Sequence, residues 1–146
     1  MSKRLDVLKR LKLLIAAAVP EAELLGLSSE EAEPARLQAG GRIIVWSGDP
    51  CEPEIDLSPL AYNWSHRIPI EVATSERLNL TSEEALDDVL MRIGAAIVGD
   101  RHLGGLCDWL DVTAPATEDL WVEGAEAPRG TELMITATYV TASPLS

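Results

Sequence analysis

The sequence has few of the residues from which catalytic sites are built. Its 146 residues include two histidines, two cysteines and no phenylalanine. It contains neither a GxSxG nor an HExxH segment, so it lacks the common serine-nucleophile turn and the zinc-binding helix of metalloproteases. No Lys-Ser or Lys-Thr pair follows the glycines between Gly99 and Gly105, and no GxGxxG segment occurs, which disfavours a nucleotide-binding enzyme. We therefore expect a protein that is not an enzyme and that binds no cofactor.

The cysteines and histidines are spread too widely to predict a metal site. Cys51 and Cys107 have no CxxC partner, so we expect two reduced thiols. His66 lies on an apolar strand face, where a hydrogen-bonded structural histidine is the expected role, and His102 falls in a turn. Because the four side chains include no short chelating pair, we expect no bound metal.

Positive charge is scarce and unevenly distributed. Twelve Lys and Arg residues stand against 24 Asp and Glu residues, for a formal net charge of -12. The first thirteen residues hold every lysine and carry five positive side chains against one negative one, so the rest of the chain is more acidic than the whole. The acidic remainder repels nucleic acid and anionic membranes, and no apolar run approaches the roughly 18 residues of a membrane-spanning helix. A basic start on an acidic body suits docking to another molecule.

The first predicted element is an amphipathic helix from Lys3 to Val19. The basic start and the apolar stretch Leu13–Val19 imitate a secretion signal, but three basic residues interrupt the apolar run. Pro20 cannot continue the helix and sets its end. The apolar residues instead recur at helical spacing, at Val7, Leu11, Leu14, Ile15 and Ala18.

Alternating and apolar runs predict the strands. The clearest is Tyr62–Thr74, in which the even-numbered residues from Tyr62 to Val72 form one face. Pro69 has no N–H to donate, so we expect it at a sheet edge or a bulge. Further strands are predicted at Arg42–Ser47, Trp109–Val112, Leu120–Glu123 and Glu132–Thr141.

A second helix is predicted after the longest strand. Thr81 and Glu84 have the spacing of a capping box, and the helix ends near Gly99. A short turn is expected at Leu103–Leu106, and a single helical turn at Ser28–Glu31. The apolar stripe of the helix comprises Leu86, Leu90, Ile93 and Ile97.

The segment from Gly48 to about residue 60 is predicted to be a long irregular loop. It combines prolines with acidic residues, a composition that favours a solvated loop over a regular element. It also lacks the mid-loop glycine and alternating ligands of a calcium-binding hand, so we expect no cation there. Its prolines are Pro50, Pro53 and Pro59, and its acidic residues are Asp49, Glu52, Glu54 and Asp56.

The order of these elements predicts one α+β domain over residues 1–146. A helix, two strands, a second helix and further strands give a mostly antiparallel sheet with two main helices packed on one face. No internal repeat or low-complexity segment is visible.

This arrangement resembles the tail terminator, or tail completion, proteins of long-tailed bacteriophages, prophages and gene transfer agents. The resemblance covers nearly the whole chain as a pattern of elements: the basic first helix, the Arg42–Ser47 strand with its proline loop, and the capped second helix. Its most specific pieces are Leu103-Gly104-Gly105-Leu106 and the closing alternating strand with Tyr139 and Thr141.

The resemblance implies a structural virion protein with no catalytic residues. Members of that family close into a hexameric ring on the tail tube, stop its growth and receive the head connector. It therefore implies three partners, namely further copies of the chain, the tail tube protein and the head–tail connector protein, with no sequence-specific nucleic acid and no membrane. The implied location is the bacterial cytoplasm during assembly and then the virion tail.

Exposed charge and aromatic side chains are the candidate contacts for such an assembly. Two other readings of the chain stay open: a small acyl- or CoA-transferring enzyme, which needs a deep pocket, and another neck or tail-tube subunit of similar fold. The candidate assembly interface consists of Trp46, Asp49, Glu52, Glu54 and Asp56, together with Lys3, Arg4 and Lys9.

We predict that the protein does not bind duplex DNA near physiological salt. A ring that passes a genome must let a polyanion slide, and an acidic lumen offers few of the salt-dependent phosphate contacts that would hold it. Fluorescence anisotropy with a labelled duplex measures this. Micromolar or tighter binding would contradict the argument and would assign the basic first helix to nucleic-acid binding.

Overall fold

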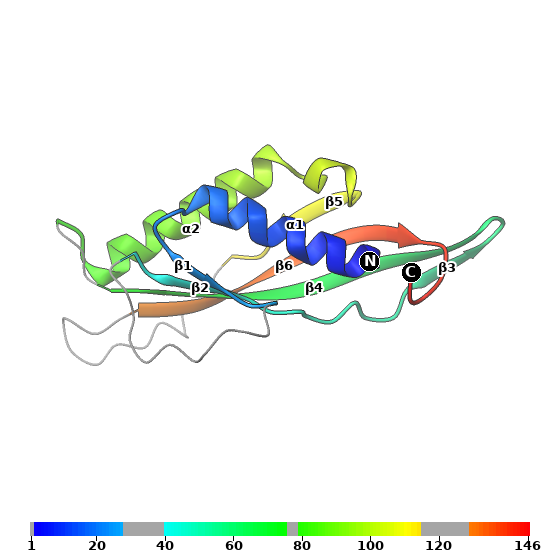
Figure 1. Cartoon of the computed structure of the whole chain (residues 1–146), viewed down its shortest axis with the longest axis horizontal. Helices are drawn as coiled ribbons and strands as arrows, with labels where there is room; N and C mark the ends of the chain where they lie inside the picture. The colour runs from blue at the N-terminus through cyan, green and yellow to red at the C-terminus, as the bar shows by residue number, and fades with distance from the viewer. Residues whose placement is uncertain (1, 28–39, 76–78, 115–128) are drawn as a thin grey trace.

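The computed structural model describes residues 2–27, 40–75, 79–114 and 129–146, and its centre is one long pair of antiparallel strands (Figure 1). β4 (Leu60–Thr74) pairs with β6 (Arg129–Thr141) in an unbroken register over residues 62–74 of β4. The strands predicted at Tyr62–Thr74 and Glu132–Thr141 are therefore confirmed, and each is slightly longer than predicted.

Six strands in the described part of the chain form a single sheet. Their order is β1-β2-β4-β6-β5, and β3 also pairs with β4. β1 and β2 are parallel, and the other described strand pairs are antiparallel. The predicted α+β class with a mostly antiparallel sheet is confirmed. The shorter strands are β1 (Glu23–Leu25), β2 (Arg42–Val45), β3 (Glu54–Leu57) and β5 (Trp109–Val112).

Two helices lie side by side on one face of this sheet (Figure 1). α1 (Lys3–Ala18) ends before Pro20, as predicted. α2 (Ser82–Gly99) begins with the predicted capping box, because the Thr81 hydroxyl accepts from the Glu84 N–H and the Glu84 carboxylate accepts from the Thr81 N–H, both at 3.2 Å. The helices therefore begin and end close to where the sequence places them.

The hydrophobic core lies between the helices and one face of the sheet. From β4, Ile68, Ile70 and Val72 are buried, which confirms the alternation seen in the sequence. Leu90, predicted within the buried stripe of α2, is only partly buried at the margin of this core. The buried apolar residues of the helices are Val7, Leu8, Leu11 and Ile15 from α1 and Ala85, Leu86, Val89, Ile93 and Ile97 from α2.

The loop predicted between Gly48 and about residue 60 contains a strand, so this part of the prediction is wrong. β3 pairs with the start of β4, from Glu54↔Asn63 to Leu57↔Leu60. The prolines do not prevent this because Pro53 precedes the strand and Pro59 follows it, so neither removes a donor from the ladder. The segment from Gly48 to Pro53 lies outside the named strands, as predicted.

The placement of Pro69 at a sheet edge is also wrong, because β4 lies between β2 and β6. The alternative of a bulge is closer to the structure. β2 ends at Val45, paired with Ile70, and the next described bridge joins Asp49 to Arg67, a shift of one residue in register. The Pro69 carbonyl accepts from the Trp46 N–H (3.1 Å), but Pro69 offers no N–H in return. The predicted strand Arg42–Ser47 is therefore two residues shorter at its end.

Four short elements remain. β1 was not predicted, and the turn expected at Leu103–Leu106 contains the short 3₁₀ helix η1 (Leu103–Gly105). The predicted helical turn at Ser28–Glu31 and the predicted strand at Leu120–Glu123 lie outside the described residues.

Candidate assembly surface

The hairpin formed by β3 and the start of β4 extends past the helices at one end of the molecule (Figure 1). We call residues 54–63 the arm. β6 runs along one edge of β4, while β2, Asp49 and β3 share the opposite edge at successive positions. All four residues of β3 are exposed, and among the described strands β3 pairs with β4 alone. The outer edge of β3 therefore has no described strand beside it.

The arm has one apolar face and one polar face. The register places Ile55 opposite Tyr62 and Leu57 opposite Leu60, so these four side chains share a face. This is the face of β4 that the helices cover further along the strand. On the arm it is uncovered, because Ile55, Leu57 and Leu60 are 52%, 82% and 51% exposed.

The opposite face of the arm carries Glu54, Asp56 and Asn63. The Asn63 side-chain amide donates to the Glu54 carbonyl (3.2 Å) and to the Asp56 carboxylate (3.0 Å). These bonds tie the two strands together on their acidic side. The arm therefore combines cross-strand hydrogen bonds on one face with an uncovered apolar surface on the other.

Aromatic contacts fix the base of the arm to the end of β6. The rings of Tyr62 and Trp64 stack with their centroids 6.5 Å apart. The Trp64 indole N–H donates to the Thr141 hydroxyl (2.8 Å), which itself donates to the Ser143 carbonyl (2.7 Å). These contacts hold the base of the arm against the end of β6.

His66 anchors the segment that leads from β2 towards the arm. Its Nε2 lies 2.7 Å from the Ser47 carbonyl and its Nδ1 lies 3.0 Å from the Tyr139 hydroxyl. Because a carbonyl only accepts, Nε2 carries the proton and the Tyr139 hydroxyl donates to Nδ1. The prediction of a hydrogen-bonded structural histidine is confirmed.

Burial affects the titration of both rings in this pair. Desolvation lowers the pKa of His66, opposed by the hydrogen bond to Ser47, and the charges of Arg4 and Asp49 add smaller opposite effects. Burial raises the pKa of Tyr139 to about 12. Both side chains are therefore neutral at physiological pH.

The acidic segment after β2 is held close to β4 at its first turn. Asp49 and Arg67 exchange two backbone hydrogen bonds of 2.9 Å, and the Asp49 carboxylate accepts from the Cys51 N–H (2.8 Å). Gly48 has a φ of +70°, and a Cβ there would lie 2.1 Å from the Arg67 carbonyl oxygen. Only glycine fits this close approach.

The structure places the eight predicted interface residues in two groups. Trp46, Asp49, Glu52, Glu54 and Asp56 are all exposed, and they lie on the segment from the end of β2 into the arm. Lys3, Arg4 and Lys9 lie on α1, where Arg4 and Lys9 are exposed. Lys3 is partly buried, and its ammonium donates to the Val140 carbonyl (3.2 Å).

The apolar face of the arm was not predicted from the sequence. The predicted loop from Gly48 to about residue 60 was inferred from its prolines and carboxylates, and it included Ile55, Leu57 and Leu60. The signal was present, because Glu54-Ile55-Asp56-Leu57 alternates as an amphipathic strand does. These residues add an apolar component to the predicted charged interface.

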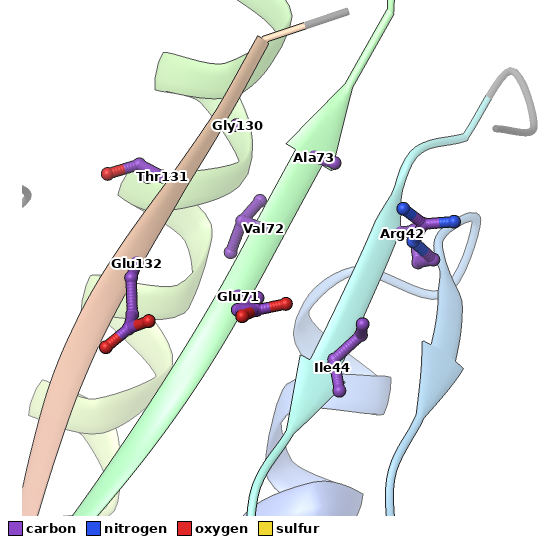
Figure 2. A pocket seen from close by; sticks show the side chains of 8 residues that line it. All are labelled: Arg42, Ile44, Glu71, Val72, Ala73, Gly130, Thr131 and Glu132. Atoms are coloured by element: carbon purple, nitrogen blue, oxygen red, sulfur yellow. The ribbon is translucent and has the colours of Figure 1, made fainter. Parts of the chain in front are cut away.

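A hollow of about 470 Å³ lies on the sheet face that the helices leave uncovered (Figure 2). Glu71 and Glu132 stand directly opposite one another on neighbouring strands, with Arg42 nearby on β2. The described residues contain no group of three or more His, Cys, Asp or Glu side chains placed to hold a metal ion. The full lining is Arg42, Ile44, Glu71, Val72, Ala73, Gly130, Thr131 and Glu132.

The two thiols have different environments. Cys51 is exposed on the acidic segment, and Cys107 is buried. Burial raises the pKa of the Cys107 thiol to about 11, so it is protonated at neutral pH, whereas a nucleophilic cysteine acts as the thiolate.

The chain matches no protein-family model and no curated protein. In the described part of the chain, neither helix has the length and apolar character needed to span a membrane.

Protonation of His66 should destabilise the protein. The pKa is lowered in the folded state, so the stability that neutral His66 contributes is present above about pH 6.5 and is lost as the pH falls towards the folded-state pKa. In His66→Gln the stability at pH 7 should fall by about 1–3 kcal/mol through loss of the Tyr139 hydrogen bond. The difference in unfolding free energy between the two proteins should become smaller below about pH 6.5.

Urea unfolding of both proteins at a series of pH values measures this difference. All other side chains are common to both proteins, so the difference between the two proteins reports on residue 66. A difference that stays constant across the range would contradict the assignment of a neutral, buried His66.

Proposed function

We propose that this chain is a structural virion protein of the tail-terminator type. In this role, copies of it close into a ring on the end of a phage tail tube, end the growth of the tube and join it to the head–tail connector. Its partners are then further copies of itself, the tail tube protein and the connector, and its locations are the bacterial cytoplasm during assembly and afterwards the virion tail.

The observation that carries this proposal is the arm. Three exposed aliphatic side chains share one face of a hairpin that no described segment covers on its outer edge. An apolar surface of this kind marks a site of contact with another molecule. Separate hydrogen bonds of His66, Trp64 and Asp49 hold the strands together at the base of the arm, so the arm leaves the sheet in a defined direction. Such a preorganised contact is useful to an assembly protein, because little entropy is lost when the contact forms.

The site chemistry also favours a structural role over an acyl- or CoA-transferring enzyme. Such an enzyme needs a pocket that encloses its substrate and a poised carboxylate or thiol. Half of the residues that line the hollow in Figure 2 are polar or charged, the hollow lies on the sheet face that the helices do not cover, and the thiol of Cys107 is held protonated. The other alternative is a neck or tail-tube subunit of similar fold, which could use the same arm. The experiment below distinguishes it from a terminator.

We expect the purified chain to form closed rings as its concentration rises. A ring repeats one contact between two different surfaces of the same subunit, and its formation depends on concentration. Sedimentation velocity should show monomers of 15.8 kDa converting to one larger species of about six copies, and negative-stain microscopy should show rings.

The form of the assembly distinguishes the candidates. Rings that stay closed and single support a terminator, whereas open tubes that lengthen with concentration indicate a tail-tube subunit. Monomers at every concentration, with the tail tube protein from the same genome present or absent, would contradict the proposal.

A further inference from the structure

The outer surface of α1 is a second exposed patch whose charge is opposite to that of the arm. Lys9, Arg10, Leu13 and Ala17 are exposed and fall on one side of the helix, away from the buried stripe. Leu13 is 62% exposed. The Arg10 guanidinium lies over η1, within 4 Å of the position that a Cβ on Gly104 would occupy. The patch therefore has an aliphatic centre with basic side chains beside it.

The arm and the segment before it carry the matching features. Four carboxylates fall between residues 49 and 56, and no Lys or Arg occurs from residue 43 to residue 66. Ile55, Leu57 and Leu60 supply the aliphatic surface. The outer edge of the arm is β3, whose carboxylates at Glu54 and Asp56 lie on the face opposite the aliphatic residues. Because no described strand lies beyond β3, long basic side chains can pass around its outer edge towards these carboxylates.

The patch on α1 and the aliphatic face of the arm do not contact each other within a single molecule. The arm extends past the start of α1 (Figure 1), and its aliphatic face remains exposed. The other helix is a poor partner for the arm, because the exposed surface at the start of α2 carries Glu84, Asp87 and Asp88 and would repel it. Among the described helical surfaces, α1 of another molecule offers the complementary charge.

We propose that the aliphatic face of the arm packs against the outer surface of α1 on a second copy of the chain. In this contact Leu57 and Ile55 lie against Leu13, and Lys9 and Arg10 reach the carboxylates of Glu54 and Asp56. The contact joins two different surfaces, so each copy uses its arm on one neighbour and its α1 on the other. This inference rests on the proposed ring, for which it names the subunit contact.

The test reverses the charge of each patch separately. One variant carries Glu54→Lys and Asp56→Lys, and the other carries Lys9→Glu and Arg10→Glu. Each variant alone sets like charges against each other, so its association should weaken by about tenfold or more at low salt. An equimolar mixture should recover ring formation, because the reversed arm then meets the reversed helix and each unchanged arm meets an unchanged helix. Both variants are checked for folding by urea unfolding.

A matched control carries Asp87→Lys and Asp88→Lys on α2. It changes the net charge as much as the arm variant does, but on a surface outside the proposed contact. Its association should match that of the unmodified chain. The substitution Leu57→Ser should weaken association at both low and high salt, because the aliphatic contact is not screened.

The possible results distinguish failure of the contact from failure of the ring. If the unmodified chain forms rings but the reversed variants associate equally well, or if their mixture does not recover, the arm-to-α1 contact is wrong and the ring proposal stands. Loss of association in the α1 variant and in the α2 control, with the arm variant unaffected, would place the partner of α1 on α2 and would likewise overturn the contact. If the unmodified chain does not associate at all, both proposals fail.

Discussion

The antiparallel ladder between β4 and β6 is the constraint on which the rest of the structure depends. Its continuous register gives every side chain of β4 a fixed face. One face meets both helices over the second half of the strand, where Ile68, Ile70 and Val72 are buried. A slip of one residue would expose these side chains and bury charged ones, so the hydrophobic core and the register stabilise one another.

The same strand serves two purposes along its length. Its second half is a core strand with β2 beside it, and its first half is one side of the arm with β3 beside it. The change occurs near Pro69 and His66, where β2 ends, the register along this edge shifts by one residue and the His66 ring holds the passing chain through the Ser47 carbonyl. The rigid core thereby positions a surface that the core does not itself cover. This division of β4 explains how a small domain can hold an uncovered apolar surface in a defined position.

The sequence correctly predicted the features that depend on interactions between residues close together in the chain. The capping box at Thr81 and the end of α1 before Pro20 follow from contacts within a few residues, and the alternation of β4 follows from the two-residue period of any strand. The structure confirms all three. The isolation of His66 among apolar residues correctly indicated a structural role. The prediction of a mostly antiparallel sheet with helices on one face needed only the order of these elements.

The errors occur where a distant strand decides the outcome. Pro69 can occupy an interior strand because β2 has ended opposite it, which the sequence around Pro69 does not reveal. β3 is a strand because the start of β4 pairs with it, although prolines and carboxylates favour a loop. For the candidate surface, composition identified the charged residues, whereas the aliphatic face required the register between two strands.

The central claim is that the arm is completed by another molecule of the same chain, and amide hydrogen exchange on the unmodified protein tests it most directly. The account predicts that amides of residues 54–63 on the arm, together with those flanking Leu13, exchange more slowly in concentrated, assembled protein than in dilute monomer. Amides of the buried half of β4 should exchange at the same slow rate in both. Assembly that leaves the exchange of the arm unchanged would contradict the account.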